Sequence, residues 1–339
     1  MKWGDGGMDP RRLKALAATV LVALAALAGA VYWVVSNDIR QDNENIQAAN
    51  QVNVGSGYRD ITYQGKRYRY NNLITCILYA GLDSVDEIKA STVYTRAPRA
   101  DTIALLVLDE YHHRMTVIAM SRDTMTEIHR FTVSGKDRGT YLDHLCYAYT
   151  YGDGGEVSAK NLCTAVSDLL YGVPVQEYVV TNRSSMPMIA DLAGKVTVTA
   201  PNDDLAELGV MAGDQVTIDS SNLEQFIRSR DTGADFSNTG RMARQQAYIN
   251  GAMNQLRSKV EDSPTEVWNT LESAGALLLT SITRNKYLDM AKALKNASYS
   301  SSNYYTLEGK QATGDRYDEF YPDEDALLKK VIELFYLPM

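Results

Sequence analysis

The chain has 339 residues, of which 45% are hydrophobic and 22% are charged, and this length is enough to bury a large core in one or two domains. Its formal net charge of −8 argues against a general nucleic-acid binder. An anionic substrate could still bind where arginines gather locally.

The N-terminal part contains one long apolar segment. Residues 15–35 form an uncharged run that would measure about 31 Å as a helix, enough to cross a bilayer. Arg11, Arg12 and Lys14 precede this run, so the positive-inside rule places the N-terminus in the cytoplasm. A cleaved signal peptide is the alternative, but the run exceeds the usual apolar core of such peptides and no clear cleavage site follows. The sequence therefore predicts a cytoplasmic tail over 1–14, a transmembrane helix and an extracellular remainder.

The next segment, 36–70, is polar and rich in Asn and Gln, which predicts a stalk between the membrane and the domain. Its end, 58–70, predicts a small hairpin that turns on Gln64 and Gly65. A buried strand over 73–82 follows and leads directly into Asp83. Ligands commonly bind at the carboxyl ends of core strands, although a helix or turn cap explains this carboxylate equally well.

Two apolar runs, 103–108 and 115–120, predict neighbouring antiparallel strands joined by a polar turn. Charged residues flank the outer ends of these strands: Arg99 and Asp101 before the first, Arg122 and Asp123 after the second. Because one strand starts where its antiparallel partner ends, these side chains should converge at one edge of the sheet. Such an edge suits an anion and a metal ion. The alternative is a set of solvated strand ends whose charges pair with one another.

Strands and helices then alternate along the chain. Residues 140–150 predict a short amphipathic helix that stops at the glycine-rich turn 152–155, and 158–170 predict a longer one. The alternation continues through 199 and indicates one three-layer α/β domain over 71–339. The cysteines leave a choice open: Cys146 and Cys163 either form a disulfide outside the cell or are unrelated buried thiols.

A second charged segment runs from 228 to 246 and carries four arginines: Arg228, Arg230, Arg241 and Arg244. Arg241 begins a long predicted helix, with Arg244 and Gln245 on the same face of its first turn. Free N–H groups at a helix start bind anions, and arginine adds a bidentate fork for phosphate. Basic residues oppose the helix dipole there, a mild penalty that a bound anion would offset. The alternative is a solvated loop whose Arg and Asp residues pair among themselves.

Taken together, these segments resemble the LytR–CpsA–Psr family of bacterial envelope proteins. The matching motifs, in the order of the family, are LYAGLDS (78–84), RADT (99–102), SRDT (121–124), HLCYAYTYGDG (144–154), YGVPVQEYVV (171–180), DLAGKVTV (191–198) and RSRDTGADFSNTGRMARQQ (228–246). Two details depart from the commonest pattern: Ala119 and Met120 precede SRDT, where a small residue and proline are frequent, and Asn-Thr precedes the last Gly-Arg pair.

The resemblance implies an α/β/α domain with a central mixed sheet and an apolar tunnel for a polyprenyl tail. It further implies an extracellular enzyme that moves a glycopolymer from a polyprenyl-pyrophosphate carrier to peptidoglycan, with Mg²⁺ or Mn²⁺ and no nucleic-acid partner. Alternatives are a polyprenyl-pyrophosphate hydrolase that uses water as the acceptor, and a non-catalytic regulator that binds polyprenyl lipids or wall polymers.

The resemblance also implies roles for individual residues. Asp101 would hold the metal or take the proton of the acceptor hydroxyl, and Asp83 would assist with the metal. The pyrophosphate would be gripped by Arg122, Arg230, Arg241 and Arg244. Supporting contacts would come from Arg99, Arg228 and Gln245.

Overall fold

The computed structural model describes residues 60–229, 238–294, 297–314 and 317–339. The predicted tail, the apolar run 15–35 and most of the predicted stalk lie outside these ranges. In the part that is described, no helix combines the length and apolarity needed to cross a membrane.

The centre of the fold is a six-stranded mixed sheet in the order β11-β8-β3-β4-β5-β12. Its strands are β3 (Ile74–Leu82), β4 (Ala100–Asp109), β5 (Arg114–Met120), β8 (Glu177–Thr181), β11 (Leu278–Thr280) and β12 (Tyr304–Thr306). β3, β4 and β5 pair antiparallel, whereas β8 is parallel to β3 and β12 is parallel to β5. The antiparallel strands predicted from the two apolar runs, and the central mixed sheet, are therefore confirmed.

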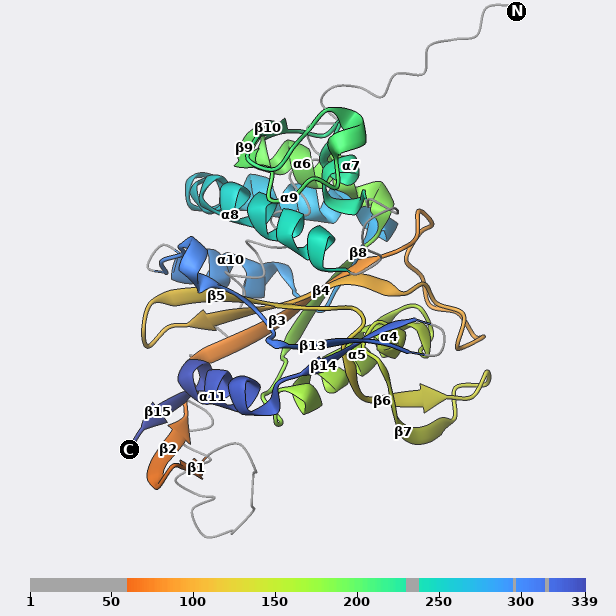
Figure 1. The fold of residues 1–339 in the computed structure, drawn as a ribbon, viewed down its shortest axis with the longest axis vertical. Helices are drawn as coiled ribbons and strands as arrows, with labels where there is room; N and C mark the ends of the chain where they lie inside the picture. Colours follow the sequence, from red (N-terminus) through yellow and green to blue (C-terminus); the bar gives the residue numbers. More distant parts are fainter. Residues whose placement is uncertain (1–59, 230–237, 295–296, 315–316) are drawn as a thin grey trace, which may run out of the picture.

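Helices cover both faces of this sheet (Figure 1). On one face lie α6 (Met186–Ala193), α7 (Leu223–Arg228), α8 (Thr239–Asp262), α9 (Pro264–Ser273) and α10 (Arg284–Leu294); on the other lie α4 (Tyr147–Thr150), α5 (Glu156–Leu169) and α11 (Glu324–Phe335). Successive side chains of β4 serve the two faces in turn: Leu106 joins the core under α8, and Leu105 joins the core over α5. Both faces are buried, which explains why the strand reads as a continuous apolar run.

Smaller sheets and turns surround the centre. They are formed by β1 (Asp60–Tyr63) and β2 (Lys66–Tyr70) with β15 (Tyr336–Pro338), by β6 (Met125–Phe131) with β7 (Asp137–His144), by β9 (Val196–Thr199) with β10 (Gln215–Ile218), and by β13 (Gly309–Thr313) with β14 (Asp318–Pro322). Short 3-10 helices lie at Arg183–Ser185, Ala206–Leu208, Gly275–Leu277 and Ser301–Asn303. The β1–β2 hairpin turns at Gln64 and Gly65, as predicted, and β2 pairs with the C-terminal strand β15. The end of the predicted stalk is thus hydrogen-bonded to the folded domain.

The predicted helix over 140–150 is wrong for most of its length. Its first residues belong to strand β7, and α4 covers only the last four. The pairing of β7 with β6 decides this, with Tyr141 opposite Ile128 and Thr140 opposite His129. Aromatic and β-branched residues fit a pleated surface, so the tertiary partner overrides the weak helical pattern.

The three cysteines are buried free thiols, so the structure contains no Cys146–Cys163 disulfide. Burial raises the pKa of each of these two thiols to about 12. They are small core residues without thiolate character at neutral pH.

Asn161 connects three elements and provides a test of the fold. Its buried side-chain amide donates to the carbonyl oxygens of His129 in β6, at 3.1 Å, and Ala148 in α4, at 2.6 Å. Asn161→Ala leaves both acceptors without this donor, so we expect the free energy of unfolding in urea to fall by about 2–3 kcal/mol. Thr164→Ala, at an exposed position of the same helix, is the control and should cost less than about 0.5 kcal/mol. Equal losses for the two variants would contradict this account.

Candidate functional site

The site begins where β4 starts and β5 ends, at one edge of the central sheet. Nη1 of Arg122 donates to Oδ1 of Asp101 at 2.7 Å, and Nε of Arg122 lies 3.3 Å from Oδ1 of Asp123. The predicted convergence of these strand ends is confirmed. The polar turn at the other end of the two strands, with Asp109 and Arg114, lies away from the site.

The first turn of α8 reaches the same carboxylate. Nη2 of Arg241 lies 3.5 Å from Oδ2 of Asp101, so one carboxylate sits between two guanidinium groups. The side chains of Asp101 and Arg241 are each only 4% exposed. Gln245, one turn further along α8, donates to the hydroxyl of Thr102 at 3.2 Å and fixes the helix against β4. The face predicted for Arg241 and Gln245 is thus directed at the sheet edge.

A second carboxylate with two arginines stands beside the first. Asp83 follows β3 directly, and its Oδ1 accepts from Nη2 of Arg228 at 2.7 Å, while Oδ2 lies 3.7 Å from Nη2 of Arg99. The hydroxyl of Ser84 accepts from the main chain of Asp86 and closes the turn here, so Asp83 is free of that task. The side chains of Asp83, Arg99 and Arg228, the Asp83 group, are 21–36% exposed. They are therefore more open to solvent than Asp101 with Arg122 and Arg241, the Asp101 group.

The charges around Asp101 determine its protonation state. Burial raises its pKa, but the attraction of Arg122 and Arg241, together with the hydrogen bond from Arg122, outweighs burial and leaves the pKa below its ordinary value. For Arg122, burial lowers the pKa, and the attraction of Asp101 and Asp123 more than reverses this. Asp101 is therefore a carboxylate at neutral pH. It is a weak base while both arginines pair with it, and it becomes a stronger one when an anion draws them away.

Arg244 lies behind the site rather than in it. Its side chain is fully buried, with Nε donating to the carbonyl of Phe226 at 2.6 Å and Nη1 to Asn202 at 2.9 Å. The same guanidinium also hydrogen-bonds to Ser229 and Asp204. It would grip a pyrophosphate only by giving up these partners. Arg230, which was predicted to share that task, lies outside the described residues.

The loop that receives Arg244 was not singled out from the sequence. Asn202 also donates to the carbonyl of Gly240 at 3.0 Å, and a Cβ at Gly240 would collide with the carboxylate of Asp204. The glycine of the Gly-Arg pair is thus required by this close approach. The order Asn-x-Asp directly after a strand and Pro201 was the available signal, but it is too common to identify the contact.

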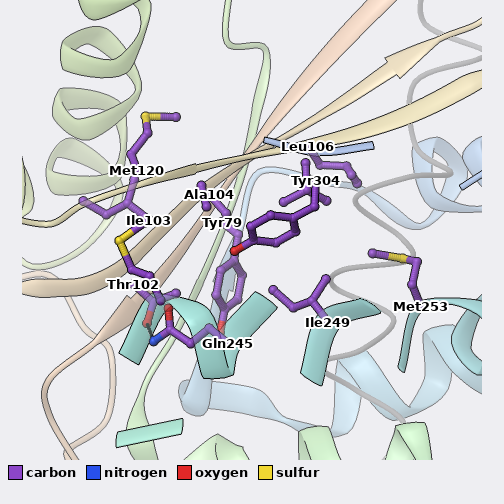
Figure 2. Close-up of a pocket in the computed structure, with 13 residues that line it drawn as sticks. Tyr79, Thr102, Ile103, Ala104, Leu106, Met120, Gln245, Ile249, Met253 and Tyr304 are labelled. Atoms are coloured by element: carbon purple, nitrogen blue, oxygen red, sulfur yellow. Dashed lines mark hydrogen bonds between the residues drawn. The ribbon is translucent and has the colours of Figure 1, made fainter. Parts of the chain in front are cut away.

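An apolar pocket opens next to the arginines, between the sheet and α8. Figure 2 shows Thr102 and Gln245 at one end of it and Ile249 and Met253 further along the helix. The rest of its lining is also apolar, apart from Tyr79 and Tyr304. Its volume is about 30 Å³, so a longer chain would enter only if flexible side chains such as those of its methionines moved aside.

The sequence is similar to those of several named proteins. TagU of Bacillus cereus, named a polyisoprenyl-teichoic acid–peptidoglycan teichoic acid transferase, is 24% identical over 200 residues, which cover 58% of this chain and 60% of that protein. The protein of the same name from Bacillus mycoides is 25% identical over 66% of each chain. The chain thus spans about 60% of the length of the first of these relatives.

Solved structures share the fold. TagT bound to LI-WTA superposes with a TM-score of 0.56 at 17% identity, covering 84% of this chain and 98% of that one. Bacillus subtilis TagV gives a TM-score of 0.55 at 17% identity, covering 77% and 96%. At these identities the likeness establishes the fold alone. The LytR_cpsA_psr family model, in contrast, matches residues 31–334, which contain all the site residues described above, and this chain therefore belongs to that family.

Proposed function

We propose that this chain transfers a glycopolymer from a polyprenyl-pyrophosphate carrier to peptidoglycan. The observation that carries the proposal is the position of Asp101, between Arg122 and Arg241 and next to Thr102, which lines an apolar pocket. This juxtaposition suits a ligand with a charged head and an apolar tail. The names of the curated relatives describe the same class of reaction, on teichoic acid.

The proposed reaction requires stabilisation of negative charge on the phosphates, and it requires no covalent intermediate on the protein. A hydroxyl oxygen of the acceptor attacks the phosphorus that carries the glycan, and the bond from that phosphorus to the bridging oxygen breaks. Polyprenyl phosphate leaves with the bond electrons, and a glycan–phosphate–acceptor diester remains. Arg122 and Arg241 would stabilise the negative charge that develops on the phosphate oxygens. Asp101 would accept the hydroxyl proton once the arginines turn toward the phosphate.

We further propose that Mg²⁺ or Mn²⁺ acts with the substrate, held by Asp83 and Asp101. The described residues gather no cluster of three His, Cys, Asp or Glu side chains that could hold a metal ion. Mg²⁺ usually binds through one or two carboxylates plus substrate phosphates and water, so two carboxylates are sufficient. In each of them Oδ2 is 3.5 Å or more from its arginine, beyond a good hydrogen bond. Such an ion would neutralise charge on the phosphates.

We infer the location from the sequence. The apolar run 15–35, with basic residues before it, would anchor the chain with its N-terminus in the cytoplasm and its domain outside. An anchored domain would meet a carrier that is itself held in the membrane by its lipid tail.

The transfer itself can be tested on the full-length chain in detergent. With a synthetic polyprenyl-pyrophosphate glycan and peptidoglycan fragments, we expect a glycan–phosphate–acceptor adduct by mass spectrometry. Arg122→Ala and Arg241→Ala should lower kcat/KM by about 10²–10³-fold, because each removes a donor to the developing charge. Arg257→Ala is the matched control, since this arginine lies on the same helix as Arg241 and pairs with Glu261, at 2.8 Å.

Other products would point elsewhere. Release of lipid phosphate without an adduct would indicate a hydrolase. Binding of the carrier without turnover under any condition would indicate a non-catalytic lipid-binding protein.

The metal is tested by titration. Treatment with EDTA should abolish transfer, and Mg²⁺ should restore it. Asp83→Asn should raise the Mg²⁺ concentration for half-maximal rate by about tenfold or more, because it weakens one ligand. Asp86→Asn, at an exposed position of the same loop, should leave that concentration unchanged. Full activity in EDTA would rule the metal out.

The ion pairs of Asp101 predict a pH effect on stability. Its folded pKa lies below the ordinary 3.8, so its stabilising contribution is complete above that value and is lost as the pH falls through the folded pKa. Asp101→Asn should cost about 3–5 kcal/mol at pH 7, because two arginines lose a buried partner. The difference between variant and wild type in urea unfolding should narrow below about pH 4. A constant difference from pH 7 to pH 3 would contradict the assignment.

A further inference from the structure

A group of tyrosines lies beside the arginine site. Tyr147 and Tyr151, one turn apart in and after α4, have ring centres 6.0 Å apart, and the ring centre of Tyr317 lies 6.5 Å from that of Tyr147. The guanidinium of Arg130 lies 5.1 Å from the ring centre of Tyr151 and 4.8 Å from that of Tyr141. The rings of Tyr317, Tyr147 and Tyr151 therefore lie side by side, and Arg130 lies between Tyr151 and Tyr141; we call these four tyrosines the tyrosine row.

The tyrosine row starts at the catalytic edge. The main-chain N–H of Cys146 donates to the carbonyl of Arg122 at 3.1 Å, and the carbonyl of Cys146 accepts from Ala100 at 3.4 Å. Tyr147 is the next residue, and its hydroxyl lies close to the guanidinium of Arg99, which also pairs with Asp83. The row is thus tied by backbone and side chains to both carboxylate groups of the site.

The surface is aromatic but not simply apolar. Tyr317 is 53% exposed and Tyr141 is 41% exposed. Between the rings, the hydroxyl of Tyr151 donates to Asp143 at 3.0 Å, and Arg130 pairs with the same carboxylate. An apolar partner such as a lipid would bury these charged groups at a cost. A sugar chain matches this surface. Each sugar ring offers C–H groups to the face of a tyrosine ring and hydroxyl groups to the polar side chains beside it.

The two faces of the sheet distinguish the lipid end of the donor from its sugar end. The apolar pocket belongs to the core under α8, whereas Tyr147 and Tyr151 pack against the core on the opposite face, where Figure 1 shows α4 beside the β13–β14 hairpin. The arginines lie at the sheet edge between them. In a polyprenyl-pyrophosphate glycan, the lipid and the sugars extend from opposite ends of the pyrophosphate. With the lipid in the pocket, the sugars would leave toward the tyrosine row.

We propose that the tyrosine row binds the first sugar units of the donor glycan by stacking on its exposed rings. This inference rests on the proposed function, since it takes the pyrophosphate carrier as the donor. The acceptor sugars of peptidoglycan would then bind elsewhere.

The test measures binding of the full-length chain to two water-soluble donor analogues. One is a short-chain prenyl pyrophosphate alone, and the other carries a disaccharide on the same pyrophosphate. We expect the wild type to bind the disaccharide form about tenfold more tightly, because stacking on one or two rings can supply a gain of that size. Tyr147→Ala and Tyr317→Ala should each abolish that difference, and Tyr317→Ala should leave the affinity for the bare analogue unchanged.

Controls separate stacking from loss of structure. Tyr147→Phe keeps the ring and should keep most of the preference for the disaccharide form. Tyr111→Ala removes a ring that is 57% exposed at the opposite end of β4, and should bind both analogues like the wild type.

Two results would overturn the inference: equal affinity of the wild type for both analogues, or a preference for the disaccharide form that survives both Ala substitutions. Failure of the wild type to bind the bare pyrophosphate analogue would instead refute the proposed function.

Discussion

The site depends on one buried carboxylate shared by two elements. The carboxylate of Asp101 forms one ion pair with Arg122, just after β5, and another with Arg241, in the first turn of α8. Taking three charges out of water costs several kcal/mol per ion, and only their mutual attraction offsets that cost. The contact therefore fixes where α8 begins on the sheet. Since α8 also forms one wall of the apolar pocket, the same interaction positions both the charged sheet edge and the pocket beside it.

The arginines of the 228–246 segment have different tasks, and burial separates them. Arg244 is enclosed and holds the carbonyls of Phe226 and Ser229 at the end of α7, where a cation also favours the helix dipole. This contact positions Arg228, in the last turn of α7, toward Asp83. Arg244 thus supports the end of α7, while Arg228 and Arg241 are directed at the carboxylates of Asp83 and Asp101. A single motif supplies both the charged groups and the support that aims them.

The sequence was informative where local pattern and tertiary environment agree. Strands buried on both faces read as apolar runs, so the β4–β5 pair and the meeting of Asp101 with Arg122 could be predicted. The strand β7 could not, because its partner β6 is what makes 137–144 extended. The role of Arg244 was also hidden, since two of its acceptors, Asn202 and Asp204, lie some forty residues away in a loop without a distinctive pattern. No sequence pattern linked the tyrosines, because it is the fold that brings Tyr147 beside Tyr317.

The arrangement of charge and burial across the sheet edge has a direction. The Asp101 group is enclosed and adjoins an apolar pocket on one face, whereas the Asp83 group is open to solvent and is linked through Arg99 to tyrosines on the other. A ligand that is apolar at one end, strongly anionic in the middle and hydroxylated at the other would meet matching groups in that order. A compact anion would use only the middle. The extended arrangement therefore supports the proposed long, amphipathic pyrophosphate substrate over a small phosphate ester.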